Sequence, residues 1–170
     1  MRFLLVPLLL VMGTAVYGQD RSADVASIDA ILAATYASIS GAAGEQRDWD
    51  RFRNLFAPEA TLSAVVEIEP GKFARRVMTP ESYVRDIGPD LTRTGFYENE
   101  IHRVTEQFGQ IAHAFSSYES RRTLQDDAPF ARGINSFQLL HDGERWFVVS
   151  IYWQAEGENR PIPTKYDGQQ

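Results

Sequence analysis

The sequence contains no cysteine among its 170 residues. This absence excludes a disulfide framework, a thiolate nucleophile and any cysteine-ligated zinc or iron–sulfur centre. Basic residues are in the minority, with 17 Lys and Arg against 23 Asp and Glu and a net charge of -6. Because a nucleic-acid binder gains affinity from cations that neutralise phosphates, this balance argues against a nucleic-acid partner.

Histidine is also scarce, with three residues and no His-x-x-x-His spacing that would place two ligands on one helix face. We therefore expect no metal centre and no cofactor. No G-x-S-x-G segment surrounds a serine, so the neighbouring Ser116 and Ser117 do not predict a hydrolase triad. We expect His113 to be a buried, hydrogen-bonded structural residue and His141 to be an exposed residue of a turn.

Only one long hydrophobic run exists, and it lies at the start of the chain. Residues 3–16 are nearly all apolar and follow a lone arginine, while Val16 and Gly18 are small enough for a cleavage site. This layout predicts a signal peptide over residues 1–18. An uncleaved anchor is the alternative, but a membrane span needs about 20 apolar residues. Without disulfides, the exported protein is expected in a bacterial periplasm or outside the cell, with no membrane contact after cleavage.

Helical signals are concentrated in the first half of the chain. Apolar residues recur at intervals of three and four over residues 24–40, as on one face of a helix. Asp48 and Thr79 are capping residues for two further helices, the first ending before Pro58 and the second closing at Gly88. We therefore predict three helices.

Strand signals dominate the rest of the chain. Alternating or β-branched segments predict six strands, at residues 61–68, 73–78, 97–108, 111–124, 131–140 and 145–154. Asp142-Gly143 is a strong hairpin signal, and residues 157–170 form a polar tail that wraps the surface or is loose. The predicted class is α+β, with three N-terminal helices packed on a strongly curved antiparallel sheet around an apolar pocket.

This order of elements resembles the nuclear transport factor 2-like superfamily, also described as SnoaL-like or cystatin-like α+β cones. The resemblance spans residues 24–156 as one domain, and the chain looks like an exported bacterial member. Its most telling segments are residues 49–61 (WDRFRNLFAPEAT), 112–119 (AHAFSSYE), 133–139 (GINSFQL) and 142–150 (DGERWFVVS). The superfamily contains isomerases, dehydratases, cyclases, transport factors and non-enzymes, so the resemblance implies the fold and leaves the function open.

The best-known enzyme of the superfamily is ketosteroid isomerase. It uses a carboxylate base together with a tyrosine and a protonated aspartate as hydrogen-bond donors. The resemblance places that tyrosine at Tyr36, the aspartate at Asn135 and the base at Ala64. Alanine cannot accept a proton, so the isomerase mechanism is not expected here, although Asn135 could still donate a hydrogen bond.

The resemblance also implies an internal pocket with aromatic walls. Its expected lining residues are Tyr36, Tyr83, His102, Tyr118, Asn135, Phe137 and Trp153. Ligand sites are mostly apolar with a few placed polar groups, which this set would provide. The alternative is a plain core in which the aromatic side chains only pack against one another.

One strand carries the candidate acid–base chemistry. Glu98, Glu100 and His102 occupy every second position of the strand expected at 97–108, which would place them on one face. Val104 would share that face, as would Phe108, and we expect its far end to be buried. A histidine beside a glutamate in an apolar pocket could act as a general acid or base, so His102 is the candidate catalytic residue. The alternative is that the glutamates are solvated and His102 lies at the rim.

The last strand carries a candidate interface. Trp146 and Trp153 are seven residues apart, so strict alternation places Trp146 on the outer face, where Tyr152 would accompany it in a homodimer contact. Contact with the C-terminal tail is the alternative. Three functions remain open at this point. They are binding of a small apolar molecule without established catalysis, a lyase or isomerase acting through His102, and a dimeric accessory module.

Overall fold

The computed structural model describes residues 21–168, so the expected signal peptide lies outside the described residues. The helices are α1 (Ile28–Ile39), α2 (Trp49–Asn54), α3 (Pro80–Asp86) and α4 (Gly88–Thr94), with short 3₁₀ helices at Ser22–Val25 and Thr164–Tyr166. The strands are β1 (Phe56–Glu69), β2 (Lys72–Met78), β3 (Tyr97–Phe108), β4 (Ile111–Arg121), β5 (Ala131–His141) and β6 (Trp146–Ala155). The six expected strands are therefore present within the described part of the chain.

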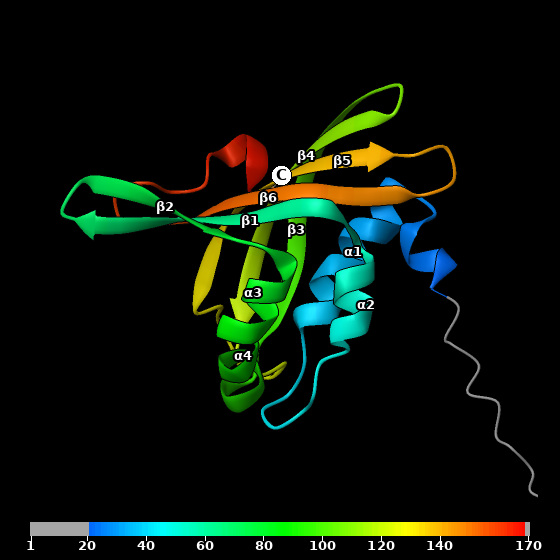
Figure 1. The fold of residues 1–170 in the computed structure, drawn as a ribbon. Helices are drawn as coiled ribbons and strands as arrows, with labels where there is room; N and C mark the ends of the chain where they lie inside the picture. Colours follow the sequence, from blue (N-terminus) through cyan, green and yellow to red (C-terminus); the bar gives the residue numbers. More distant parts are fainter. Residues whose placement is uncertain (1–20, 169–170) are drawn as a thin grey trace, which may run out of the picture.

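The strands form one curved, open sheet with the helices on its concave side (Figure 1). Its order is β2-β1-β6-β5-β4-β3. Four neighbouring pairs are antiparallel, but β1 and β6 run parallel, so the expected all-antiparallel sheet is wrong at this pair. The cause is the connection through α3 and α4, which carries the chain from β2 at one edge to β3 at the other. Three hairpin reversals then return β6 beside β1 in the same direction.

The helix starts follow the expected capping residues. The Asp48 carboxylate accepts a hydrogen bond from the backbone N–H of Arg51 at 2.8 Å, and Thr79 Oγ1 accepts one from Ser82 N–H at 3.1 Å. The expected count of three N-terminal helices is wrong, because α3 and α4 both lie between strands and α4 was not expected. Gly88-Pro89 begins α4 instead of only ending α3, since a proline fits the first turn of a helix.

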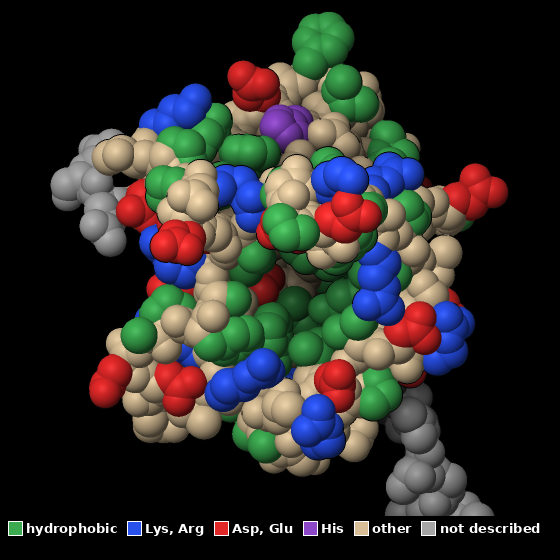
Figure 2. Space-filling model, turned by 90° about the vertical axis from the view of Figure 1, so that its left-hand side faces the viewer, with side chains coloured by type: hydrophobic (Ala, Val, Ile, Leu, Met, Phe, Trp, Pro, Cys, Tyr) green, Lys and Arg blue, Asp and Glu red, His purple; other side chains and the backbone are tan. Residues whose placement is uncertain are grey.

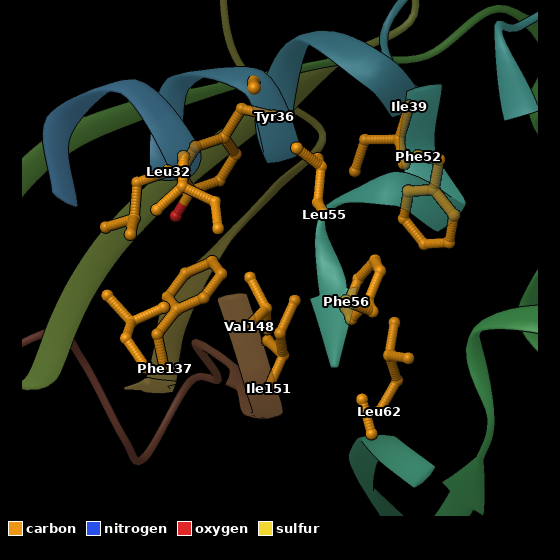
Figure 3. Close-up of a cluster of buried hydrophobic side chains, with 14 of the residues drawn as sticks. Leu32, Tyr36, Ile39, Phe52, Leu55, Phe56, Leu62, Phe137, Val148 and Ile151 are labelled. Carbon is orange, nitrogen blue, oxygen red and sulfur yellow. The ribbon is translucent and has the colours of Figure 1, made fainter. Parts of the chain in front are cut away.

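The apolar face of α1 packs on the centre of the sheet (Figure 3). Side chains from α1 and α2 meet side chains from β1, β5 and β6 in one buried cluster, which includes Leu32, Tyr36, Ile39, Phe52, Leu55, Phe56, Leu62, Phe137, Val148 and Ile151. Burial of each large apolar side chain contributes about 1.5–3 kcal/mol to folding. This cluster holds α1 against the sheet.

The bulges in β3 and β6 each insert one unpaired residue into the strand. In β3, Glu100 pairs with Tyr118 and His102 pairs with Ser117, which leaves Ile101 as the extra residue. Side chains alternate between the two faces on either side of a bulge, but the alternation is inverted across it. The face on which a residue lies therefore depends on which side of the bulge it occupies.

The bulge in β6 corrects the expected position of Trp146. Val148 pairs with Leu139 and Ser150 with Gln138, so Val149 is the extra residue. With this insertion Trp146 lies on the inner face with Val148; it is 7% exposed, and its ring lies 5.1 Å from that of His141. Trp146 is therefore part of the core and cannot form the outer interface that strict alternation predicted.

The C-terminal segment after β6 crosses the outer face of the sheet (Figure 1). The ring of Tyr166 packs edge-on against Phe115 of β4 at 5.0 Å between centroids. Arg132 of β5 forms ion pairs with Glu156 and Asp167. These contacts attach the segment to β4 and β5. No helix between residues 21 and 168 is long and apolar enough to cross a membrane.

Candidate functional site

A cavity of about 290 Å³ lies between the concave face of the sheet and the helices. Figure 2 shows this face of the molecule hollowed, with hydrophobic side chains on its floor and charged side chains of both signs around its rim. Most of the wall is apolar. Its hydrophobic residues other than the expected ones are Ile39, Phe52, Leu62, Ala64, Val66, Met78, Ile87, Leu91, Phe96, Phe130, Ala131 and Ile151. Its polar residues include Thr35, Arg76, Glu98 and Ser120.

Six of the seven expected pocket residues lie at this cavity. They come from α1, α3, β4, β5 and β6, and are Tyr36, Tyr83, Tyr118, Asn135, Phe137 and Trp153. The helical spacing of α1 and the alternation of the strands bring these distant residues together. Binding of a ligand there stays a prediction.

His102 is the exception, and the bulge at Ile101 is the reason. It is not among the residues that line the cavity. It pairs with Ser117 on the outer side of the sheet, and its Cβ lies beside Gly168 of the C-terminal segment. The next residue, Arg103, takes the inner position and forms an ion pair with Asp29 of α1. The expected shared face of the two glutamates and His102 is therefore wrong.

The far end of β3 is not buried as expected. Val104 is 42% exposed and Phe108 is 84% exposed. β3 is an edge strand, and Phe108 lies at the tip of its hairpin with β4. Burial along β3 is therefore confined to the half that faces the cavity.

The other two histidines lie outside the cavity lining. His113 Nε2 lies 3.0 Å from Ser136 Oγ, so it is hydrogen-bonded, although it is only half-buried. His141 is half-buried against Trp146 rather than exposed. Between residues 21 and 168, no three His, Asp or Glu side chains gather closely enough to hold a metal ion.

Glu98 is the titratable acid at the cavity, although the sequence pattern placed it beside His102 and favoured His102 as the catalytic candidate. Its carboxylate accepts hydrogen bonds from Ser120 Oγ at 2.9 Å and from Asn135 Nδ2 at 3.5 Å. Burial among apolar walls raises the pKa of Glu98 to about 7, although these hydrogen bonds oppose the shift. Alternation alone places Glu98 on the inner face, but its depth depends on the helices over that face, of which α1 packs against β3.

A chain of hydrogen bonds extends from Glu98 through Asn135 to the buried end of the cavity. Asn135 Nδ2 donates to Tyr36 Oη at 3.1 Å, and Tyr36 Oη lies 2.6 Å from Ser116 Oγ. Ser116 in turn donates to Glu100. Burial is the main cause that raises the pKa of Tyr36, and it has the same effect on Tyr83 and Tyr118. These three phenols are therefore neutral at physiological pH.

The donor directions in this chain can be assigned from the chemistry of its members. Glu100 lies 3.6 Å from Arg103 and, as a carboxylate, can only accept. Ser116 has one proton, which it gives to Glu100, so Tyr36 must donate its own proton to Ser116. The two amide protons of Asn135 point to Tyr36 and Glu98. The two donors that the resemblance suggested are therefore already engaged inside the protein.

Comparison with known proteins identifies the fold. No protein-family model matches the sequence, and no curated protein does. A Novosphingobium aromaticivorans structure, assigned as the beta subunit of an aromatic-ring-hydroxylating dioxygenase, matches with a TM-score of 0.59 at 14% identity over 81% of this chain and 95% of that chain.

Two further solved structures have no known function. One, from Nostoc punctiforme and described as having a cystatin-like fold, matches with a TM-score of 0.57 at 12% identity over 77% of this chain and 90% of the other. The second, an NTF-2-like protein from Silicibacter pomeroyi, matches with a TM-score of 0.51 at 16% identity over 77% and 94%. Identities this low establish architecture and not activity. The protein therefore has the cystatin-like α+β fold of the nuclear transport factor 2-like proteins, as the sequence resemblance predicted.

Proposed function

We propose that the protein binds a small, largely apolar molecule in the cavity on the concave side of the sheet. The observation that carries this proposal is the cavity itself, with apolar walls and a few polar groups converging at its inner end. Its volume of about 290 Å³ is close to the lower end of the range of about 300–1,000 Å³ for small-molecule sites. A compact ligand fits this space.

The polar groups at the inner end support a site more than a plain core. The hydroxyl groups of Tyr83 and Tyr118 have no hydrogen-bond partner among the described residues, although both side chains are buried. Buried polar groups are normally hydrogen-bonded, so hydroxyls that face a cavity without partners are suited to a ligand or to water. A ligand would also remove the apolar walls from solvent.

A ligand screen by thermal unfolding tests the proposal. Compounds that bind only the folded state raise the unfolding temperature by mass action. We expect a subset of compact apolar compounds to do so for the natural chain but not for Ala64→Phe, which places a ring in the cavity. If no compound in a diverse apolar set shifts the natural chain, the binding proposal is overturned.

Acid–base catalysis by Glu98 is the second candidate function. A carboxyl group with a pKa of about 7 can both take and give a proton near neutral pH. Because His102 lies outside the cavity, Glu98 replaces it as the candidate acid–base residue of the lyase or isomerase alternative. Once a ligand is identified, NMR detection of deuterium uptake at its carbon atoms tests this candidate. We expect deuterium uptake to be lost in Glu98→Gln and retained in His102→Ala. Uptake that survives in Glu98→Gln would exclude catalysis by Glu98.

We also propose that the protein is exported, because residues 1–18 have the pattern of a signal peptide. Expression in a bacterial host tests this proposal. Amino-terminal sequencing of the periplasmic protein is expected to begin at Gln19. A cytoplasmic protein that keeps its first residues would contradict it.

A dimeric accessory module remains the third candidate. Tyr152 is 46% exposed on the outer face of β6, where a second copy could pack, but Trp146 no longer supports this contact. One structural neighbour is assigned as a subunit of a larger enzyme. Sedimentation equilibrium distinguishes the cases, because a monomer at high concentration would count against a homodimer.

A further inference from the structure

The inner end of the cavity contains a carboxylate without a counter-ion. If the cavity binds a ligand, this carboxylate affects which charge the ligand can have. Glu98 forms no ion pair with any described residue. The other charged lining residue is Arg76, which is exposed at the rim and which, after Arg85, helps to lower the pKa of Asp86 on α3. Charges removed from water are normally paired, so an unpaired carboxylate favours a ligand that supplies the cation.

The hydrogen bonds next to Glu98 use up most of the protons that this end of the cavity could donate to a ligand. Tyr36 gives its proton to Ser116, and both amide protons of Asn135 are engaged. Ser120 gives its proton to Glu98 itself. A ligand anion or oxyanion would therefore meet a carboxylate here and would have to rely on the hydroxyls of Tyr83 and Tyr118. A ligand that donates protons meets an available acceptor.

The remaining surroundings of Glu98 also suit a cation. Aromatic side chains from three elements, Tyr83, Tyr118 and Trp153, line the same cavity, and the faces of such rings attract organic cations. The titratable groups that face Glu98 are Tyr36 on α1, Tyr83 on α3 and Tyr118 on β4, with Glu100 one hydrogen-bond step further along β3. The three tyrosines stay neutral near pH 7, whereas Glu98 changes its charge there.

We propose that the cavity takes a small organic cation, in which an ammonium group bound by the Glu98 carboxylate is attached to a compact, ring-bearing apolar body. The cavity walls accept the apolar body, and the carboxylate compensates for the loss of water around the ammonium group. This inference rests on the proposed binding function and narrows it to one ligand charge.

Three probes of matched shape test the inference by titration calorimetry at pH 8. They are 2-phenylethylamine, 2-phenylethanol and phenylacetate, which differ in the charge of the end group. We expect the amine to bind at least tenfold more tightly than the alcohol and the carboxylate to bind most weakly. Glu98→Gln is expected to lower amine affinity at least tenfold while alcohol affinity stays within twofold. The matched control is Glu119→Gln, which makes the same change on the outer face of β4 and is expected to alter neither.

The pH dependence gives a second, independent readout. Between pH 8 and pH 6 the ionised fraction of a carboxyl group with a pKa of about 7 falls roughly tenfold. Amine affinity of the natural chain should fall by the same factor, whereas that of Glu98→Gln should stay nearly constant. Affinity for the amine that is flat between these pH values would overturn the inference.

The remaining outcomes separate this inference from the binding proposal. The preference for a cation would be overturned if the alcohol bound as tightly as the amine, or if the wider screen found neutral ligands and no amine. Either result would leave an apolar binding site. Phenylacetate binding that is tighter than amine binding at pH 8 would show that the site prefers an anion, and would overturn the inference as well. Failure of every probe and of the whole screen would remove the binding function itself.

Discussion

The concave side of the sheet has one filled region and one hollow region. At the filled region, α1 is 12 residues long and brings Leu32 against the central strands, where Val148 of β6 is fully buried. At the hollow region, α3 and α4 have seven residues each and adjoin at Gly88, so they cover the sheet without filling the space beneath. The difference indicates that one region supplies stability, while the other is free to form a site.

The largest expected effect concerns the residue that joins the two regions. Arg47 is 6% exposed, and its guanidinium donates to the backbone carbonyls of Ile39 at the end of α1, Gly41 in the following loop and Leu91 in α4. Arg47→Met would remove these hydrogen bonds. The Gly41 carbonyl would keep its bond from the Phe96 N–H, whereas the loss at Ile39 and Leu91 costs about 1–3 kcal/mol for each buried group. We expect the free energy of unfolding in urea to fall by about 4 kcal/mol.

Arg93→Met on the exposed side of α4 is the matched control and should change stability by less than about 0.5 kcal/mol. Equal stabilities for the two variants would show that Arg47 does not connect α1 and α4. If Arg47→Met weakened ligand binding strongly but lowered the free energy of unfolding only slightly, the main role of Arg47 would be to shape the hollow region.

The next effect concerns the filled region. Leu32 is 1% exposed and does not line the cavity. Leu32→Ala removes packed methyl groups and leaves a void, so we expect the free energy of unfolding to fall by about 3 kcal/mol. Ligand affinity should stay within about threefold if the regions are independent, since the change lies outside the site. Calorimetry on the folded variant measures both, and a tenfold loss of affinity would show that the two regions are coupled.

A smaller effect concerns the hollow region and its pH dependence. The native pKa of Glu98 is raised to about 7, so between its unfolded value near 4.5 and pH 7 the native state holds a proton that the unfolded state has lost. The stability that the protonated Glu98 contributes is therefore present at low pH. It is lost as pH rises through that window, by on the order of 2 kcal/mol for this half-buried carboxyl group.

Urea denaturation of the natural chain and of Glu98→Gln at pH 5 and pH 8 measures this contribution. The variant should be the more stable of the two at pH 8, and the gap should narrow or reverse at pH 5. Identical pH profiles for both proteins would show that Glu98 titrates normally and that the hollow region is well solvated.

The smallest effect concerns His102, on the outer side of β3. His102→Ala removes a half-buried ring beside Gly168 and no group of the cavity. We expect ligand affinity to change less than twofold and stability to change by less than about 1 kcal/mol. A tenfold loss of affinity in calorimetry would contradict the outward position that the bulge gives this residue.

Local chemistry made much of the fold predictable from the sequence. Capping residues such as Asp48 and Thr79 act within one turn of a helix, so their effect can be predicted locally. Alternation within a strand without a bulge correctly predicted that Tyr118 and Phe137 face the cavity. The parallel pairing of β1 and β6 and the presence of α4 depend on contacts between distant segments. The sequence therefore predicted the elements better than their connections.

The errors at the candidate site share one physical cause. His102 and Trp146 were each assigned to a face by counting residues, and each count crosses a bulge, at Ile101 or at Val149. A bulge depends on how the neighbouring strand pairs, so it leaves no reliable mark in a single sequence. The depth of Glu98 was missed for a related reason, because it depends on helices from elsewhere in the chain, such as α1, that pack over this face of the sheet.

The bulge at Ile101 also determines how this chain has to be compared with others. In a protein of the same fold with an unbulged strand at this place, the residue aligned with His102 without a gap would face the opposite side of the sheet. An alignment that is correct in space needs a one-residue gap at position 101. In the same way, the gain or loss of a single codon would bring a different side chain into the cavity while the composition of the strand stays almost unchanged.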